Sequence, residues 1–405
     1  MKSPRPRIAI LGGGPTGLEA ALAGAEKGFP FTIYEAAPSV AGRMREWGHV
    51  RLFTPWSMNV SERMRGALQA AGHEPPATDD CPSGAELVDT VLDPVAGLEN
   101  IRDHVRLSAR VMQIGRVGLL KHEEIGSGRR AEHAFRLLVS DGGGREWTEA
   151  ADIVLDCTGN SEPNALGAGG IAAPGEKALG GAVHREVPDL DIDAETWAGK
   201  TTLLAGDGHS AQTALVDLVR LAGRRPGTNI IWVTRSVLEG AVADDPLPGR
   251  ANLTGAAAEL AEHPPSCLTV VPCATVDELR PGARIGVTLR GAGGEATSVE
   301  VDAVLALTGR VGDHTIYRQL QVHECWATSG PMKLASALMA QSGGGDCLDQ
   351  TSLGPETLRN PEPGFFILGI KSYGRMGDFL MRVGWEQVDE VFQLIEADEV
   401  LRGKA

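Results

Sequence analysis

The sequence predicts an α/β fold, and three observations in its 405 residues indicate it. A glycine-rich turn, Gly12 to Gly17, follows the apolar run Ile8 to Leu11 and precedes a helix-like segment. A second turn of the same kind, Gly206 to Ala211, stands between a strand pattern and a helix pattern in the second half. Each series then continues through a strand, a β meander and a strand that ends in Thr-Gly. The same order occurring twice predicts two doubly wound domains of one design.

The first glycine-rich turn has G-x-G-x-x-G spacing, with Gly12, Gly14 and Gly17 as its glycines. In this arrangement the first glycine allows a tight turn from strand to helix. The second lets backbone N–H groups approach a pyrophosphate, and the third lets the helix pack on the sheet. The helix N-terminus adds N–H donors and a partial positive charge. The turn therefore predicts a dinucleotide-binding site.

An acidic residue stands where such a site needs one. Residues 31–35 predict the second strand, which ends in Glu35, 18 residues after Gly17. A carboxylate about this far along the chain accepts hydrogen bonds from a ribose 2′-hydroxyl. The alternative, a glycine-rich turn in some other α/β protein, is disfavoured once Glu35 is counted. We also expect the following loop, 41–44, to bring Arg43 back over the pyrophosphate.

Composition and charge bound the class of protein. The chain is 42% hydrophobic and 22% charged, which is typical of a soluble globular protein, and its net charge is −15. No basic cluster is interleaved with aromatics, so nucleic acid and anionic membranes are not expected as partners. Residues 1–7 leave no room for a signal peptide, and no apolar run approaches the ~18 residues of a membrane span. We therefore expect a cytoplasmic protein.

The six cysteines are scattered without a close-set pair. We expect most of them to be buried free thiols, and we expect no metal site.

Both series predict strands, helices and meanders in the same order. In the first half we expect helices at 61–72 and 83–95, a meander of 105–111, 135–140 and 147–153 with a hairpin turn at 141–144, and a strand ending at Thr158-Gly159. In the second half we expect a strand at 200–205, a helix at 212–222, a strand at 229–235, a meander of 268–271, 285–290 and 298–301, and a strand ending at Thr308-Gly309. Residues 365–375 predict a last strand with its loop, and 381–396 predict a helix.

With these motifs the chain resembles the flavoproteins that have two dinucleotide-binding domains. This superfamily includes glutathione- and thioredoxin-reductase-like enzymes, NADH dehydrogenases and class B flavin-containing monooxygenases. The resemblance covers nearly the whole chain. It implies two Rossmann-like domains, the second inserted in the first. The FAD-binding domain would comprise a first segment at 1–165 and a second segment at 309–405, and the NAD(P)H-binding domain would lie at 195–308. The second FAD-binding segment would carry active-site loops and the C-terminal strand and helix.

The resemblance also implies where the cofactors FAD and NADPH bind. The residues implied for FAD are Gly12, Gly14, Thr16, Gly17, Glu35, Arg43, Gly159, Gly369 and Arg375. The residues implied for NADPH are Gly206, Gly208, Ser210, Ala211 and Arg235. The N-terminus of the helix at 381–396 would point at the flavin pyrimidine edge. The Gly-Asp usual in the family is Gly369-Ile370 here, so the ribityl carboxylate is missing or is supplied from elsewhere, for example by Asp378.

The preference for NADPH depends on the second strand of the second series. Arg235 stands there in the place that Glu35 has in the first series. A guanidinium suits a 2′-phosphate, whereas an arginine merely exposed at a strand end remains the alternative. Asp207 lies inside the second turn, and its charge disfavours a pyrophosphate. The second site could therefore be weak, or not be used for a nucleotide.

Thiol chemistry and oxygen chemistry are the two enzymatic alternatives. Reductases of the superfamily need paired cysteines beside the flavin, or a cysteine in the first glycine turn, and that position is Thr16 here. A single-cysteine variant stays open through Cys325 or Cys347, although packing is the simpler role for both. Class B monooxygenases carry a fingerprint before the second turn, and Gly180, His184 and Pro188 match some of its positions.

The resemblance favours an FAD- and NADPH-dependent oxidoreductase, of the monooxygenase type, that oxidises a small molecule with O2. An NADPH-dependent reductase of a disulfide, quinone or protein acceptor is the first alternative, and a non-catalytic flavin- or nucleotide-binding redox sensor is the second. A homodimer is compatible with each. The catalytic candidates are His49, Tyr373 and Cys325, and His49 and Tyr373 are the proton handlers among them. Other pocket candidates are Arg51, Trp56, Lys371 and Arg375. The segment 47–56, rich in aromatic and basic residues, either lines that pocket or packs as an ordinary loop.

Overall fold

The computed structural model describes residues 5–238, 245–341, 350–377, 379–398 and 401. The chain forms two compact units. The first unit comprises the described residues of Met1–Gly48, Pro55–Glu162 and Val311–Ala405, and the second comprises those of His49–Thr54 and Pro163–Arg310. The second unit is thus inserted in the first, as predicted.

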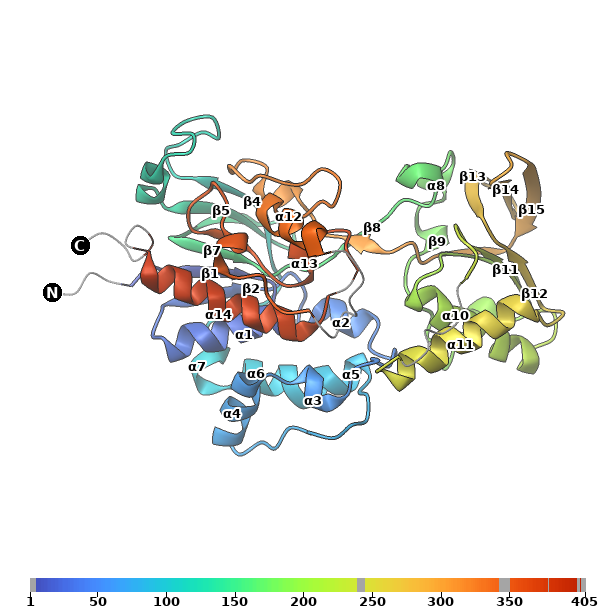
Figure 1. Ribbon diagram of the computed structural model, residues 1–405, viewed down its shortest axis with the longest axis horizontal. Helices are drawn as coiled ribbons and strands as arrows, with labels where there is room; N and C mark the ends of the chain where they lie inside the picture. The colour runs from blue at the N-terminus through green and yellow to red at the C-terminus, as the bar shows by residue number, and fades with distance from the viewer. Residues whose placement is uncertain (1–4, 239–244, 342–349, 378, 399–400, 402–405) are drawn as a thin grey trace. The chain divides into compact units, whose positions relative to one another are not determined.

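The first unit is built on a five-stranded parallel sheet with strand order β18-β7-β1-β2-β3. Figure 1 labels three of these strands, β1, β2 and β7. Its strands are β1 (Ile8–Leu11), β2 (Phe31–Tyr34), β3 (Val105–Arg106), β7 (Ile153–Asp156) and β18 (Phe365–Ile367). All four residues of β1 and of β7 are buried, because these strands lie inside the sheet with both faces covered. The C-terminal strand β18 pairs with β7, so the end of the chain completes the sheet that its beginning starts.

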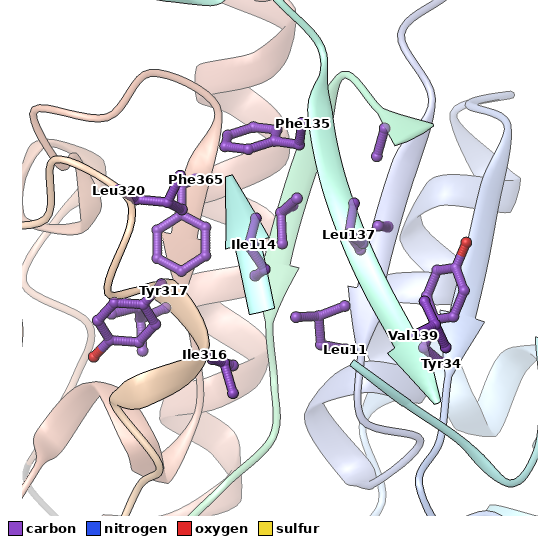
Figure 2. Packing of buried hydrophobic residues seen from close by; sticks show 14 of the residues in the cluster. Leu11, Tyr34, Ile114, Phe135, Leu137, Val139, Ile316, Tyr317, Leu320 and Phe365 are labelled. Atoms are coloured by element: carbon purple, nitrogen blue, oxygen red, sulfur yellow. The ribbon is translucent and has the colours of Figure 1, made fainter. Parts of the chain in front are cut away.

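An antiparallel meander covers one face of this sheet, and helices cover the other. The meander consists of β4 (Ala109–Arg116), β5 (Phe135–Asp141) and β6 (Glu146–Ala151). Figure 2 shows its inward side chains, such as Ile114 and Leu137, against Leu11 of β1. The opposite face carries α1 (Pro15–Glu26) and α14 (Met381–Ala397), whose Phe392 lies near Phe31 of β2. The unit therefore has three layers.

The second unit repeats this three-layer design. Its parallel sheet has the order β12-β11-β10-β16-β9, from β9 (Val183–His184), β10 (Thr201–Ala205), β11 (Asn229–Val233), β12 (Leu268–Val271) and β16 (Ala303–Ala306). Leu203 and Val304 face the meander of β13 (Ala274–Arg280), β14 (Ile285–Gly291) and β15 (Ala296–Val301). Leu204 and Leu305 face the side covered by α10 (His209–Arg224) and α11 (Pro248–Glu262). The predicted fold class is confirmed by this repetition.

The remaining described elements are short. In the first unit they are α2 (Gly42–Glu46), α3 (Trp56–Asn59), α4 (Glu62–Ala70), α5 (Gly84–Leu87), η1 (Val88–Leu92), α6 (Asp93–Gly97), α7 (Glu99–Arg102), η2 (Gly128–Glu132), η5 (Thr315–Tyr317), α12 (Met332–Gln341), η7 (Pro355–Leu358) and α13 (Ile370–Tyr373). In the second unit they are η3 (Ala168–Gly170), α8 (Glu176–Leu179), η4 (Gly180–Ala182) and α9 (Ala194–Trp197). The segments that join the units form the strands β8 (Glu162–Pro163) and β17 (Arg310–Val311).

Two of the predicted meander strands are partly wrong, for one physical reason. A residue with positive φ ends the parallel strand before the meander begins. Ser108 (φ 50°) separates β3, which joins the parallel sheet, from β4, so 105–111 is not one strand. Cys273 (φ 52°) likewise separates β12 from β13, a strand that the sequence did not predict. The helix α11 was also missed.

The segment His49–Thr54 belongs to the second unit, although the predicted boundaries place it in the first. Val50 packs against the helix-side core of the second unit. The Phe53 ring meets the His209 ring edge-on, with 5.1 Å between centroids, and lies against Gly249. These contacts join residues that are far apart in the sequence, so no local sequence pattern predicts them.

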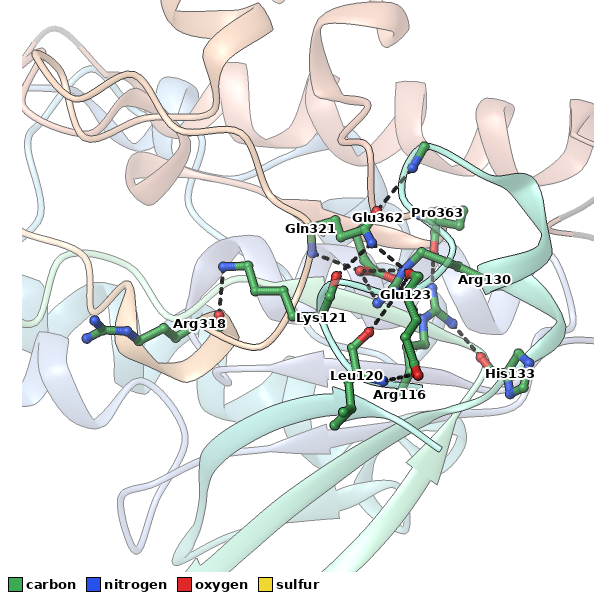
Figure 3. A network of polar contacts seen from close by, with 11 residues as sticks. Arg116, Leu120, Lys121, Glu123, Arg130, His133, Arg318, Gln321, Glu362 and Pro363 are labelled. Atoms are coloured by element: carbon green, nitrogen blue, oxygen red, sulfur yellow. Dashed lines mark hydrogen bonds and ion pairs between the residues drawn. The ribbon is translucent and has the colours of Figure 1, made fainter. Parts of the chain in front are cut away.

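A buried charge cluster fastens the meander of the first unit to the segment before β18 (Figure 3). Glu362 accepts hydrogen bonds from Arg116 Nε (2.8 Å) and Arg130 Nη2 (2.9 Å), and the three side chains are fully buried. The Gln321 N–H donates to the same carboxylate (2.9 Å). Burial raises the pKa of Glu362, but these hydrogen bonds outweigh it and hold the pKa below its ordinary value.

Within the ranges given above, no helix is both long and apolar enough to cross a membrane. The same residues hold no group of three or more His, Cys, Asp or Glu side chains that could bind a metal ion.

Candidate functional site

The first glycine turn has the geometry that a phosphate-binding turn requires. Gly12 has φ 94°, and a Cβ there would lie 2.6 Å from the Cys157 carbonyl oxygen. A Cβ on Gly17 would lie 1.9 Å from the Gly12 carbonyl oxygen. Gly14, in contrast, faces open space, with nothing within 4 Å of the Cβ position. Among the described residues no side chain caps the N-terminus of α1, so its first N–H groups are available to a ligand.

Glu35 lies beside this turn at the end of β2 and is almost fully buried. Its Oε2 accepts a hydrogen bond from the Gly13 N–H (2.7 Å) and its Oε1 accepts one from the Ala37 N–H (2.9 Å). These bonds fix the carboxylate next to the glycine turn, and each oxygen keeps a second lone pair. These free acceptor positions therefore fit the hydroxyl groups of a dinucleotide ribose.

The end of β18 packs closely onto the same turn. Thr16 lies against two glycines, Gly369 after β18 and Gly384 in α14, where a Cβ would come within 2.7 Å and 3.0 Å of the Thr16 hydroxyl. The Gly369 N–H donates to Gln387 Oε1 (2.8 Å), and Gln387 Nε2 donates to Ser372 Oγ (3.0 Å). Sequence reasoning missed Gln387, although an amide in the buried stripe of an amphipathic helix is a signal that could have revealed it.

The Thr158–Gly159 turn at the end of β7 is the third component of this site. Thr158 is exposed, Gly159 has φ 68°, and Ile370 lies 3.8 Å from the Cβ position of Gly159. The buried Oδ1 of Asn160 has no hydrogen-bond partner among the described residues. An orphaned acceptor beside an exposed turn fits a ligand hydroxyl that would donate to it.

Two arginines predicted for FAD are engaged in local contacts. Arg43 lies in a short helix, α2, and not in a loop as predicted; its guanidinium pairs with Glu46 one turn further on. The helix begins at Gly42 because Ala41 takes a left-handed conformation (φ 53°) and starts a turn there. Arg375 donates to Ser329 Oγ (3.3 Å).

The three catalytic candidates fall into different units. Tyr373 and Cys325 belong to the first unit, whereas His49 belongs to the second, where its Nδ1 lies 4.0 Å from Asp189. Tyr373 is buried against Phe379, and burial raises its pKa to about 12, with Glu386 and Glu390 adding to the effect. The phenol therefore keeps its proton at neutral pH. Cys347 and Asp378 lie outside the described residues.

Cys325 occupies a tight turn. Its N–H donates to the Gly330 carbonyl (2.8 Å), and its carbonyl accepts from the Ser329 N–H (2.8 Å). Hydrogen bonds from the side chain and N–H of Thr328 lower the pKa of the Cys325 thiol, whereas burial raises the pKa of Cys157. The turn contacts the loop after Tyr373, because the Arg375 N–H donates to the Thr328 carbonyl (2.7 Å).

A polar cluster that the sequence did not predict lies beside this region. Tyr317 donates to Glu324 Oε1 (2.5 Å), which also lies 2.8 Å from His314 Nδ1. Burial and the nearby Glu324 raise the pKa of Tyr317. Burial raises the pKa of Glu324 too, but the hydrogen bonds from His314 and Tyr317 outweigh it and lower the value. The cluster brings together residues ten positions apart, which periodicity cannot show.

The second glycine turn repeats the first in its own unit. Gly206 has φ 132°, and a Cβ there would lie 2.3 Å from the Leu307 carbonyl oxygen and 3.4 Å from Ala211. Gly208 faces open space, and within the described ranges no side chain caps α10, whose first turn includes Ser210. This turn therefore also leaves N–H groups available.

Asp207 points toward the end of β11. Its Oδ1 lies 3.9 Å from Arg235 Nη2, and its Oδ2 accepts a weak hydrogen bond from Ser236 Oγ (3.4 Å). The Arg235 side chain is 82% exposed. An exposed pair at this distance holds Arg235 only weakly, so the guanidinium remains available to a ligand.

The partial monooxygenase fingerprint lies at the edge of the second sheet. His184, in β9, packs its ring edge-on against Trp197 with 4.8 Å between centroids. Burial, together with Lys200, lowers the pKa of His184. The lowered pKa favours the uncharged imidazole in this contact.

Two doubly wound α/β units, one inserted in the other and each with an open glycine turn, make up this fold. Solved structures of other proteins have the same fold. The chain is similar to bacillithiol disulfide reductase from Bacillus cereus, with 17% identity, 97% of this chain and 99% of that chain covered, and a TM-score of 0.68. It is similar to ornithine hydroxylase from Pseudomonas aeruginosa, with 16% identity, 98% of this chain and 99% of that chain covered, and a TM-score of 0.66. It is also similar to the cadaverine monooxygenase of desferrioxamine biosynthesis from Erwinia amylovora, which was solved with FAD. For that structure the identity is 13%, 100% of this chain and 98% of that chain are covered, and the TM-score is 0.66.

No protein-family model matches the chain, and no curated protein matches it by sequence.

Proposed function

We propose that this protein is an FAD-dependent oxidoreductase that takes its electrons from NADPH and oxidises a small molecule with O2. The observation that carries the proposal is the pair of open glycine turns, one in each unit, at Gly14 and Gly208. FAD would lie on the first turn with its ribose on Glu35, and NADPH on the second. When bound, FAD would supply the two-electron redox chemistry between NADPH and O2.

The chain's own residues would shape the flavin site. The Thr158–Gly159 turn and Asn160 would contact the flavin chain, and Gln387 would hold the end of β18 in place. The N-terminus of α14, which has no side-chain cap among the described residues, would stabilise negative charge on the flavin by about 0.3–1 kcal/mol. Tyr373, protonated at neutral pH, would act as a hydrogen-bond donor.

Oxygenation is favoured over thiol chemistry by the contacts of Thr16. A relative with a cysteine at this position would present a sulfur to the flavin. Here a hydroxyl occupies it, packed between Gly369 and Gly384. No disulfide forms among Cys81, Cys157, Cys267, Cys273 and Cys325, the cysteines within the described ranges.

The reductase remains the second candidate because of Cys325. Its thiol has a lowered pKa and its turn touches the loop after Tyr373. A thiolate there could attack a disulfide substrate.

Three measurements test these proposals. Anaerobic NADPH should bleach the flavin absorbance of the purified protein, and a flavin that neither NADPH nor NADH bleaches would contradict both enzymatic proposals.

In air, the rate of NADPH oxidation should rise when a suitable small molecule is added, and the product should contain one oxygen atom from O2. Because proteins of this fold act on ornithine and cadaverine, these amines are the first probes. Anaerobic reduction of bacillithiol disulfide that Cys325→Ser abolishes would instead establish the reductase.

Arg235 and Asp207 give a test of the second site. Arg235→Ala should weaken NADPH binding by roughly 10–100-fold and leave NADH nearly unchanged, because a charge-assisted hydrogen bond to the 2′-phosphate is lost. Asp207→Asn, which removes the opposing charge, should strengthen NADPH binding a few-fold. The measurement is the Kd for each nucleotide by titration, and Arg220→Ala, on the exposed side of α10, is the matched control. Equal losses for NADPH and NADH would show that Arg235 does not read the 2′-phosphate.

A further inference from the structure

Lys371 lies in α13, four residues after the end of β18, and is fully buried. Its Nζ donates three hydrogen bonds: to Asp156 Oδ2 (2.6 Å), to Thr158 Oγ1 (3.0 Å) and to the Asp313 carbonyl (2.7 Å). An ammonium has three N–H donors, so all of them are used. The sequence suggested Lys371 as a pocket residue, and the structure places it beneath the surface.

The partner Asp156 is equally buried, and both of its oxygens are engaged. Oδ2 accepts from Lys371, whereas Oδ1 accepts from the hydroxyl of Thr158 (2.6 Å) and from its N–H (3.2 Å). The Thr158 hydroxyl thus donates to Asp156 and accepts from Lys371. An exposed turn is held from beneath by a buried ion pair.

The surroundings fit the lysine closely. A Cβ on Gly312 would lie 2.5 Å from Lys371 Cγ, so only glycine leaves room for the stem. The ammonium also lies 5.2 Å from the centre of the Tyr317 ring. The pair therefore joins three segments: the end of β7, the first residues after β17, and α13.

Stability alone does not explain this arrangement. Two buried charges replaced by well-packed apolar side chains are often neutral or stabilising, because desolvation offsets their attraction. The resemblance led us to expect a carboxylate after Gly369, but Ile370 stands there and Lys371 follows it. This ion pair is costly to bury, and it contacts the Thr158–Gly159 turn. We therefore expect that the function of the protein requires this turn to be held in one conformation.

We propose that Lys371 and Asp156 are positioning residues that hold the Thr158–Gly159 turn in the conformation that binds FAD. This inference rests on the proposed function of the first glycine turn. Asn160, whose buried Oδ1 has no partner within the described ranges, follows the same turn and would be placed toward the flavin chain with it.

The test compares variants that remove the connection with variants that preserve it. Thr158→Val removes the hydroxyl at an exposed position, and Thr158→Ser keeps it. In the double variant Lys371→Met with Asp156→Leu, both charges are removed together. Each protein is measured for its urea midpoint without flavin, its Kd for FAD by flavin fluorescence, and the midpoint potential of bound flavin.

We expect Thr158→Val and the double variant to bind FAD at least ten-fold more weakly and to shift the flavin potential. Thr158→Ser should retain both properties, and the urea midpoint of the double variant, which leaves no buried charge unpaired, should stay close to that of the wild type. A merely structural pair would move the urea midpoint and leave the potential unchanged. If Thr158→Val and the double variant bind FAD within two-fold of the wild type, the inference is wrong. If the wild-type chain itself binds no FAD, the proposed function fails and this inference fails with it.

Discussion

Replacing Glu362 by glutamine is expected to lower the free energy of unfolding by about 3–5 kcal/mol. The change leaves Arg116 and Arg130 as buried cations without the carboxylate that both of them contact. A glutamine oxygen can accept one of these hydrogen bonds, but it carries no charge, and its amide group adds donors where the neighbours are donors. Urea unfolding followed by circular dichroism measures the loss.

The effect of this substitution should depend on pH in a defined direction. The pKa of Glu362 is lowered in the folded protein, so its ionised form contributes stability above the ordinary glutamate pKa of about 4.3. That contribution is lost as the pH falls through the folded pKa. The difference between wild type and variant should therefore be constant near neutral pH and shrink in acid.

A surface pair provides the matched control. Glu356 forms an ion pair with Arg359 (2.7 Å), and its side chain is 70% exposed. Glu356→Gln should cost at most about 1 kcal/mol. If Glu362→Gln and Glu356→Gln lowered the free energy of unfolding equally, the buried cluster would contribute no more to stability than the surface pair.

Replacing Gly14 by alanine is expected to weaken FAD binding by roughly 10–100-fold and to leave the fold intact. Gly14 has φ −82°, which alanine adopts freely, and its Cβ would enter space that is open in the structure. If the pyrophosphate approaches the backbone there, the methyl group overpacks the site by about 1–3 kcal/mol. The measurements are the Kd for FAD and the urea midpoint of the flavin-free protein.

Two other glycines make this result interpretable. Gly17→Ala should lower both FAD affinity and stability, because its Cβ would clash with the Gly12 backbone. Gly66 lies in α4, and nothing lies within 4 Å of its Cβ position. Gly66→Ala should therefore leave the FAD affinity unchanged and raise the stability slightly. Unchanged FAD affinity in Gly14→Ala would show that the pyrophosphate does not lie on this turn.

Local patterns were enough for most of the fold. Both glycine turns and both Thr-Gly strands form as expected, and the helices expected from residues 61 and 83 begin at side-chain caps, Ser61 and Ser83, the latter in a capping box with Glu86. These features depend on residues a few positions apart, whose preferences act on the backbone directly. Predictions fail at Ser108 and Cys273, where the chain passes from the parallel sheet to the meander. Each of these residues has a positive φ, and no local sequence pattern marks a positive φ in a residue other than glycine.

The site divides in the same way. The sequence by itself determined the two glycine turns and Glu35, because a phosphate-binding turn is a local structure with fixed spacing. Only the tertiary structure decided that Lys371 is buried on Asp156, that Gln387 holds Gly369, and that His49–Thr54 belongs to the second unit. Those contacts join residues up to 215 positions apart, and a buried charge or amide selects its partner only when folding removes water from both.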